Sequence, residues 1–317
     1  MDVTVILCTY NRCESLAIAL ESVAASRMPD GVSWEVLVVD NNSKDETRRV
    51  AEDFVTRYPG RFRYAFEARP GKSNALNSAV QKSSAPVLAF MDDDVQVEPD
   101  WLHRLTGVFE DPTYIGSGGK ILPERGFDPP AWLDTSVPYS LAALAMFDLG
   151  ANPEELKEPP FGTNMAFRRE VFVRYGEFRR DLGPQPGSEI RSEDTEFGMR
   201  LLRGGERIWY VPDAVVYHAV SSKRLTKAYF LSWWYGKGRG DVRESGLEGD
   251  GKLRLLGIPI VLLRRILVRG TRWLLSSSTT QRFTHKTKVW WLAGKIHEAF
   301  ASSQKNQVQV SEPQSTP

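Results

Sequence analysis

The sequence predicts an α/β protein built on a mixed, mainly parallel sheet flanked by helices. Short apolar runs that suit buried strands, such as Val3–Cys8, Trp34–Val39 and Val87–Met91, alternate with stretches whose apolar residues recur at helical spacing. A turn rich in Thr, Asn or Asp follows each of these runs. Strands that alternate with helices form βαβ units, and such units pair their strands in parallel.

The individual elements follow from local signals along the chain. In chain order we expect strands at 3–8, 34–39, 61–66, 87–91, 115–121, 162–167, 207–211 and 214–218. We expect helices that begin near Arg12, Ser43, Gly71, Pro99, Arg169 and Glu193. Ser43 and Glu46 have the spacing of a capping box, and proline suits the first turn of a helix. Residues 123–160 are rich in proline and are expected to be irregular.

The composition is that of a soluble globular protein with an uneven charge distribution. Hydrophobic residues make up 41% of the chain and charged residues 26%, and the net charge is +1. The segment from Ala219 to Glu298 contains 16 Lys/Arg and five Asp/Glu, whereas the rest of the chain is acidic. A basic end on an acidic body suggests that this end contacts something anionic.

The cysteine content and the N-terminus bear on the compartment. Cys8 and Cys13 are the only cysteines, and their positions in a strand and just after a turn favour free thiols in a reducing compartment. The N-terminus enters a strand without the features of a signal peptide. No run of about 18 apolar residues is present, so we expect no transmembrane helix. Together these features predict a cytoplasmic protein.

The stretch at residues 87–102, VLAFMDDDVQVEPDWL, places three aspartates at the end of a predicted buried strand. Carboxylates at the carboxyl edge of a sheet repel one another and resist burial, so a cation should compensate them, and a divalent metal ion would serve. Ligands of open α/β sheets also bind at this edge. The alternative is an acidic turn that is simply hydrated.

Six stretches taken together resemble the family 2 glycosyltransferases of the GT-A fold. They are VTVILCTYNR (3–12), VVDNNSKDET (38–47), GKSNALN (71–77), FMDDDVQVEPDWL (90–102), GTNMAFRREVF (162–172) and SEDTEFGMRLLRGG (192–205). They occur in the family's order, and the first strand lacks the G-x-G-x-x-G fingerprint of dinucleotide-binding proteins. The resemblance implies a GT-A fold and transfer of a sugar from a nucleoside-diphosphate sugar.

The resemblance also implies a division of the chain. Residues 1–222 are expected to form the catalytic domain, with a sugar-nucleotide-binding part at 1–121 and an acceptor-binding part at 122–222. Residues 223–300 are expected to form a basic amphipathic helical extension, and the polar residues 301–317 a disordered tail.

By the resemblance, eight residues contact the nucleotide sugar: Cys8, Thr9, Tyr10, Arg12, Asp40, Lys72, Asp92 and Asp93. The carboxylate of Asp40 could accept a hydrogen bond from a uracil N–H or a ribose hydroxyl, although Asp is also a common turn residue. Lys72 precedes a predicted helix and could steady a phosphate, or it could be a hydrated surface lysine. Cys8 stands where the family usually has proline.

The acidic triplet resembles the family's D-x-D element. The resemblance implies that Asp94 holds Mg²⁺ or Mn²⁺, which bridges the diphosphate of the donor. Hard cations that also bind water and phosphate need only one or two protein carboxylates. His218 ends a predicted strand; it is either a structural histidine or a further metal ligand, as in some GT-A enzymes.

Glu193 and Asp194 begin a predicted helix, where the helix dipole favours acids and Ser192 could act as the N-cap. That structural role is sufficient by itself. By the resemblance, however, the pair lies at the acceptor site, where Asp194 is the general base and Glu193 helps to position it. Gly162, Thr163 and Asn164 would line the acceptor side by resemblance only.

Residues 252–275, KLRLLGIPIVLLRRILVRGTRWLL, mix dense apolar residues with arginine. Such a segment could lie in the plane of an anionic membrane surface, and it is too short and too charged to span a bilayer. The alternative is a helix that packs on the catalytic domain with hydrated arginines. Nucleic-acid binding is a weaker reading, because no known module pattern is present.

The sequence therefore predicts an inverting, metal-dependent glycosyltransferase that uses a UDP-sugar by preference. The Q-x-x-R-W element and the transmembrane helices of processive synthases are missing, so transfer of single sugars is expected. A peripheral position on the cytoplasmic face of the membrane would suit a saccharide or lipid-linked acceptor in envelope or exopolysaccharide biosynthesis. A nucleotidyltransferase-like enzyme and a non-catalytic sugar-nucleotide-binding protein are the alternatives.

Overall fold

The chain packs as two compact units. The computed structural model describes residues 1–188, 190–247, 253–255 and 258–311, with only the backbone for 302–311. The first unit consists of Met1–Asp128, Leu144–Ser188 and Glu193–Ser221. The second consists of Pro129–Ala143, a short segment that ends at Ser192 and the chain from Ser222 on. The domain boundary expected at residue 222 stays a prediction, and Pro129–Ala143 pack with the C-terminal unit.

A nine-stranded sheet forms the centre of the first unit, with the order β3-β2-β1-β4-β8-β6-β9-β5 and with β7 paired to β9. The strands are β1 (Val3–Thr9), β2 (Trp34–Asp40), β3 (Phe62–Phe66), β4 (Val87–Asp92), β5 (Val95–Val97), β6 (Tyr114–Pro123), β7 (Glu154–Glu155), β8 (Asn164–Arg168) and β9 (Arg207–His218). Strands β3, β2, β1 and β4 are parallel, and β8 joins β4 and β6 in antiparallel pairs. The predicted α/β class is confirmed.

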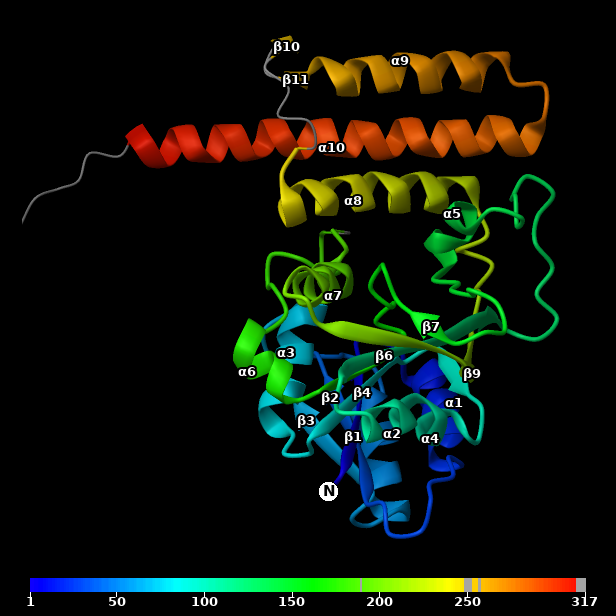
Figure 1. Cartoon of the computed structure of the whole chain (residues 1–317), viewed down its shortest axis with the longest axis vertical. Helices are drawn as coiled ribbons and strands as arrows, with labels where there is room; N and C mark the ends of the chain where they lie inside the picture. The colour runs from blue at the N-terminus through cyan, green and yellow to red at the C-terminus, as the bar shows by residue number, and fades with distance from the viewer. Residues whose placement is uncertain (189, 248–252, 256–257, 312–317) are drawn as a thin grey trace, which may run out of the picture. The chain divides into compact units, whose positions relative to one another are not determined.

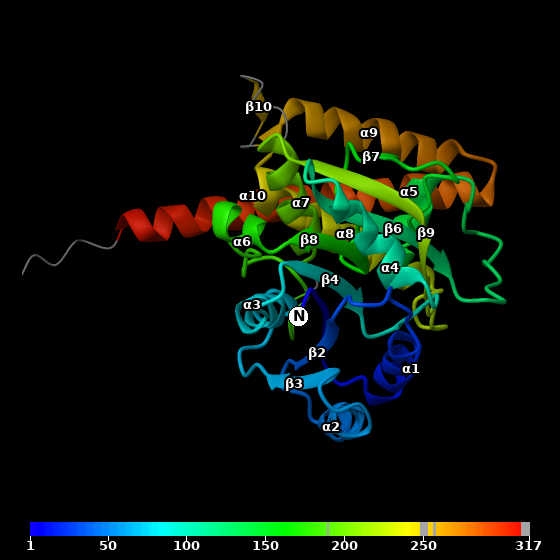
Figure 2. The same cartoon turned by 60° about the horizontal axis from the view of Figure 1, so that its bottom comes forward.

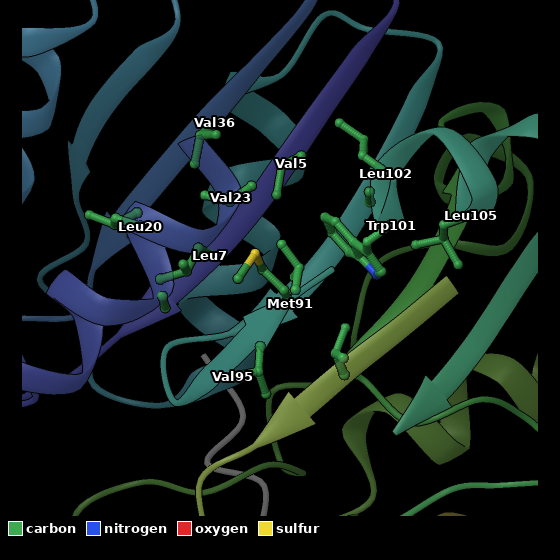
Figure 3. Close-up of a cluster of buried hydrophobic side chains, with 14 of the residues drawn as sticks. Val5, Leu7, Leu20, Val23, Val36, Met91, Val95, Trp101, Leu102 and Leu105 are labelled. Atoms are coloured by element: carbon green, nitrogen blue, oxygen red, sulfur yellow. The ribbon is translucent and has the colours of Figure 1, made fainter. Parts of the chain in front are cut away.

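Helices cover both faces of this sheet. They are α1 (Cys13–Ala24), α2 (Thr47–Arg57), α3 (Lys72–Lys82), α4 (Trp101–Gly107), α6 (Glu170–Tyr175) and α7 (Glu193–Arg203). Alternate residues of each strand point to opposite faces, so Val5 and Leu7 pack with α1 and α4 (Figure 3), whereas Ile6 packs with α3 and α7. In Figure 2, α1 and α3 lie on opposite sides of the parallel strands.

Two local expectations about β9 and α4 differ from the structure. The two strands expected at 207–211 and 214–218 are one strand, β9, whose pairing with β6 jumps from Val211 opposite Gly119 to Val215 opposite Lys120. The irregularity absorbs Pro212, which cannot donate to the ladder. Pro99 precedes α4 rather than opening it, because α4 begins at Trp101.

The predicted capping box of α2 is also wrong. The Ser43 hydroxyl accepts a hydrogen bond from the backbone N–H of Asn11 at 2.9 Å instead of capping α2. Asp45 binds the first N–H group of α2 instead. Its carboxylate accepts hydrogen bonds from the N–H of Thr47 at 3.1 Å and from the N–H of Cys13 at 3.0 Å. Burial opposes the ionisation of Asp45, but hydrogen bonding from the Thr47 side chain and from these two N–H groups lowers its pKa to about 2. One carboxylate therefore serves the first turns of both α1 and α2.

The second unit contains three long helices, α8 (Lys227–Ser245), α9 (Ile260–Leu275) and α10 (Thr279–Ser311), together with the short α5 (Pro138–Leu141). Within it α10 lies between α8 and α9 (Figure 1). Glu298, buried on α10, holds Arg239 and Arg243 of α8 at 2.8 Å and 2.5 Å. α10 continues to Ser311, so residues 301–311 of the expected disordered tail are helical, and residues 312–317 lie outside the described chain. No helix in the described ranges is both long and apolar enough to cross a membrane.

Candidate active site

The carboxyl ends of the parallel strands bring the predicted site residues to one edge of the sheet. The strand registers place Cys8 opposite Asp92 and Thr9 opposite Asp40. Asp92 is the last residue of β4, and the chain turns through Asp93 and Asp94 into β5. This edge is where open α/β sheets bind their ligands.

Lys72, the first residue of α3, forms the centre of a partly buried charge cluster. Its Nζ lies 2.7 Å from Oδ1 of Asp92 and 3.6 Å from Oε1 of Glu193. The hydroxyl of Thr163 donates to the other oxygen of Asp92 at 2.7 Å. β4, α3, α7 and the segment before β8 therefore meet at a single point. Lys72 is not the hydrated surface lysine that the sequence allowed.

Asp194 lines the same cavity as the charge cluster around Lys72. A small cavity of about 10 Å³ is lined by both halves of the predicted site: Cys8, Lys72, Leu76, Phe90, Met91, Asp92, Gly162, Met165, Glu193 and Asp194. The Asp194 carboxylate accepts hydrogen bonds from the N–H groups of Gly162 and Thr195, both at 2.7 Å. A Cβ added at Gly162 would lie only 3.1 Å from Oδ2 of Asp194, which explains why glycine suits this position.

The charges of this cluster shift one another's proton affinity. Burial would lower the pKa of Lys72, but the carboxylates of Asp92 and Glu193 outweigh burial and raise it. Burial, and then the charge of Asp194, raises the pKa of Glu193. Burial would raise the pKa of Asp92, but Lys72 lowers it. Lys72 therefore stays protonated, and its main ion-pair partner is Asp92.

Arg12, Asp93, Asp94 and His218 form a second group of polar side chains at the same turn. Nη1 of Arg12 lies 2.9 Å from Oδ1 of Asp93 and 2.6 Å from Oδ2 of Asp94. Nε2 of His218 lies 3.4 Å from the other oxygen of Asp94, because β5 pairs with β9 and places Val95 opposite His218. Burial, together with the charges of Asp94 and Asp92, raises the pKa of Asp93 to about 6 against the effect of Arg12.

The predicted nucleotide residues at β1 and β2 lie at this edge but differ in exposure. The ring of Tyr10 is 44% exposed and free to meet a planar ligand, whereas Thr9 is buried. Asp40 is buried and accepts from the Tyr64 hydroxyl at 3.0 Å and from the N–H of Ser43 at 2.9 Å. Asp40 therefore closes its own turn, and its contact with a nucleotide stays a prediction.

Asn164 is a predicted site residue that does not line the cavity. It is fully buried, its Oδ1 accepts from Nε1 of Trp101 at 2.8 Å, and its Nδ2 donates to the carbonyls of Lys120 and Ala214. All its hydrogen-bonding groups are engaged inside the core, and its contact with the acceptor stays a prediction.

Asn41 is a positioning residue that the sequence did not reveal. Its Nδ2 donates to the carbonyls of Glu67 and Arg69, and its Oδ1 accepts from the N–H of Gly71 at 2.8 Å. These bonds fix the segment that delivers Lys72 to the cavity. The asparagine pair after Asp40 was a visible turn signal, but the partners lie about thirty residues away.

Solved structures are similar to this chain in their fold. The mannosyltransferase PcManGT from Pyrobaculum calidifontis, in complex with GDP-Man and Mn²⁺, superposes with a TM-score of 0.61 at 21% identity, over 94% of this chain and 86% of that one. TarS 1-349 of S. aureus in complex with UDP superposes with a TM-score of 0.51 at 15% identity, over 96% and 92%. The fold is that of the GT-A glycosyltransferases, as the sequence predicted.

The chain is also similar to curated proteins. The chain is 26% identical over 242 residues to glucosyl-dolichyl phosphate glucuronosyltransferase of Haloferax volcanii, covering 74% of this chain and 75% of the relative. It is 28% identical over 234 residues to succinoglycan biosynthesis protein ExoM of Rhizobium meliloti, covering 74% and 72%. The model of glycosyl transferase family 2 matches residues 4–176, more than half of the chain, so this protein belongs to that family and is a glycosyltransferase.

Proposed function

We propose that this enzyme transfers a sugar from a nucleoside-diphosphate sugar, with UDP-sugar as the favoured donor, to an acceptor hydroxyl with inversion of the anomeric centre. One observation carries the proposal: Asp92 at the end of β4 and Asp194 at the start of α7 line the same cavity. An acid on the donor side and an acid on the acceptor side of a single cavity suit a direct displacement.

Asp194 is the residue that we assign as the general base. The N–H groups of Gly162 and Thr195 fix its carboxylate without donating a charge to it, so it can still take a proton from an alcohol. Glu193, whose pKa is raised by burial and then by Asp194, lies beside Lys72 and would help to position Asp194. Neighbouring acids in unlike surroundings can take separate roles in this way.

The residues around Asp94 fit a divalent metal ion. Asp94 and His218 offer an oxygen and a nitrogen 3.4 Å apart, and the guanidinium of Arg12 shows that a cation is tolerated at this carboxylate. No group of three or more His, Cys, Asp or Glu forms a metal site among the residues described, so phosphate and water would complete the shell. Mg²⁺ or Mn²⁺ bound there would neutralise charge on the departing diphosphate. The Mn²⁺ in the complex of PcManGT supports this assignment.

A thermal-shift screen of UDP, GDP, CDP and dTDP with and without Mn²⁺ tests the donor and the metal together. We expect UDP with Mn²⁺ to give the largest rise in melting temperature, because a ligand that binds the folded state stabilises it by mass action. Asp94→Asn should remove the Mn²⁺-dependent part of the shift, whereas Asp213→Asn, at an exposed acid of β9, should leave it. A larger shift with GDP than with UDP would mean that the donor carries guanine instead of uracil. No shift with any nucleotide would overturn the proposal of a nucleoside-diphosphate sugar donor.

We propose a place in envelope or exopolysaccharide biosynthesis, with a saccharide or lipid-linked saccharide as acceptor. The names of the two relatives, a glucosyl-dolichyl phosphate glucuronosyltransferase and a succinoglycan biosynthesis protein, support this proposal.

We also propose that the protein is cytoplasmic and binds the membrane surface through residues 252–275. In the described part of that segment, Leu267, Leu274 and Leu275 of α9 are 68%, 65% and 84% exposed. Apolar side chains between arginines suit an anionic bilayer surface.

Vesicle flotation tests the membrane contact. Leu267→Gln/Leu274→Gln should weaken binding to vesicles containing phosphatidylglycerol by at least about tenfold. Each substitution removes the favourable free energy of burying a leucine side chain in the membrane, roughly 1.5 kcal/mol or more. Ile18→Gln/Val173→Gln is the matched control, because these side chains are 55% and 83% exposed in the first unit. Equal flotation of both double variants and the wild type would contradict the contact.

A further inference from the structure

The second unit carries positive charge that its own acids do not balance. From Lys252 to His297 the sequence contains ten Lys/Arg and no Asp or Glu. Elsewhere in this unit arginines are paired: Arg239 and Arg243, for example, both bind Glu298. Within the described ranges, six basic residues of α9 and α10 have no carboxylate at ion-pair distance: Arg264, Arg269, Arg272, Arg282, Lys286 and Lys288.

Three of these residues form one group with His285, which we call the basic cluster: Arg269 and Arg272 of α9 with His285 and Lys288 of α10. The members of each pair are three residues apart and therefore share a face of their helix. Burial, followed by the charges of Arg269 and Arg272, lowers the pKa of Lys288. Burial and the same two arginines, with Lys288, lower the pKa of His285. Arg269 and Arg272 of α9 thus repel Lys288 of α10 and disfavour a charge on His285.

Buried polar atoms with unmet hydrogen-bonding capacity accompany the basic cluster. Nδ1 of His285, Oη of Tyr139 and Nε1 of Trp234 are buried without a hydrogen-bond partner among the described residues. The ring of Tyr139 stacks on Trp234 with centroids 3.8 Å apart, and Nζ of Lys288 lies 4.8 Å from the centre of the Tyr139 ring. A buried polar group left without a partner costs about 1–3 kcal/mol. A negatively charged ligand with several acceptor oxygens would neutralise the positive charge and could accept hydrogen bonds from these polar groups.

An apolar groove of about 540 Å³ runs along the same helices. Its walls come from α8, α9 and α10: Tyr235, Ile266, Ala293, Ile296, His297 and Phe300. The hydroxyl of Tyr235 is hydrogen-bonded to His297, so the polar atoms of this wall are engaged with each other. Arg269 follows Ile266 by three residues, about 4.5 Å along α9. Lys288 precedes Ala293 by five residues, about 7.5 Å along α10. Along both helix axes, the groove and the basic cluster therefore lie within about one and a half turns of each other.

We propose that the basic cluster and the groove together bind a lipid phosphate, with the phosphate on the cluster and the hydrocarbon chain in the groove. A phosphate ester supplies charged acceptor oxygens to Arg269 and Arg272, which bind such groups through paired N–H donors. Its chain covers Ile266, Ile296 and Phe300 and removes their surface from water. This site goes beyond the proposed surface contact, because it holds one ligand in a defined place and rests only on residues of the second unit.

Titration of the full-length protein with dodecyl phosphate, kept below its micellar concentration, tests the site. Tryptophan fluorescence reports on it, because Trp273 and Trp290 lie with ring centroids 6.0 Å apart beside the cluster. We expect saturable binding that Arg269→Gln/Arg272→Gln weakens by at least about tenfold. Arg264→Gln/Arg282→Gln is the matched control: it removes the same charge at exposed positions of the same helices and should change binding by less than about twofold. Circular dichroism shows whether each variant is folded.

Competing ligands separate the two parts of the site. Inorganic phosphate should compete only weakly, and dodecyl maltoside, which has an uncharged head group, should bind far more weakly than dodecyl phosphate. Equal loss of binding in both double variants would mean that net charge alone is responsible and would overturn the site. So would inorganic phosphate or dodecyl maltoside binding as tightly as dodecyl phosphate. The titration measures ligand binding and not sugar transfer, so the site can fail while the proposed activity stands.

Discussion

Asp194→Asn is expected to lower the kcat of sugar transfer by about 10²–10⁴-fold, because the acceptor hydroxyl would lose its general base. Asparagine keeps the size of the side chain, and its amide oxygen can still accept one of the two hydrogen bonds that Gly162 and Thr195 donate. The cavity should therefore keep its shape and the affinity for the nucleoside diphosphate should change little. Steady-state kinetics and a nucleotide titration on the same preparation separate the two effects.

Asp213→Asn is the control for this substitution. It makes the same chemical change at an exposed acid of the first unit, 3.7 Å from Arg104, and should leave kcat within about twofold. The configuration of the product, read by NMR, tests inversion independently. An Asp194→Asn enzyme that transfers sugar at nearly the wild-type rate would place the base elsewhere.

Gly294→Ala is expected to destabilise the second unit by about 3 kcal/mol, the upper end of the usual cost of overpacking. A Cβ at Gly294 of α10 would lie 2.1 Å from the backbone oxygen of Tyr235 on α8. At Gly238 of α8 it would lie 2.0 Å from the backbone oxygen of Trp291. Backbone atoms cannot move aside as a flexible side chain does, so the two helices would have to separate. Thermal unfolding followed by circular dichroism, together with limited proteolysis of the C-terminal region, measures the loss.

Gly270→Ala provides a matched control in the same unit. Nothing lies within 4 Å of a Cβ added at this position of α9. The same substitution there should stabilise the helix by up to about 1 kcal/mol, because alanine has the higher helix propensity. The two variants should therefore shift the melting temperature in opposite directions. A Gly294→Ala protein that melts at or above the wild-type temperature would contradict the close crossing of α8 and α10.

Much of the fold could be predicted because its signals are local. The strands at 3–8, 34–39 and 87–91 were apolar runs that end at polar turns, and the structure has β1, β2 and β4 there. The start of α7 at Glu193 was equally visible, since acids favour the first turn of a helix. The capping of α2 was not predictable, because the Ser43 hydroxyl bonds to Asn11, 32 residues away. The strand β5 was missed, because three residues carry too little pattern.

The sequence by itself determined the family and the kinds of residue at the strand ends, because motif order and apolar periodicity are properties of the chain alone. Only the tertiary structure decided which of those residues meet. Asp92 and Asp194 are about a hundred positions apart, and the sheet brings them to one cavity. The tertiary structure also engages Asn164 in the core and pairs Arg12 with Asp93 and Asp94. In the second unit it brings arginines of α9 close to Lys288 of α10. The physical reason is that spacing along a chain fixes the face of a helix or strand, whereas the distance between two elements depends on how the whole chain packs.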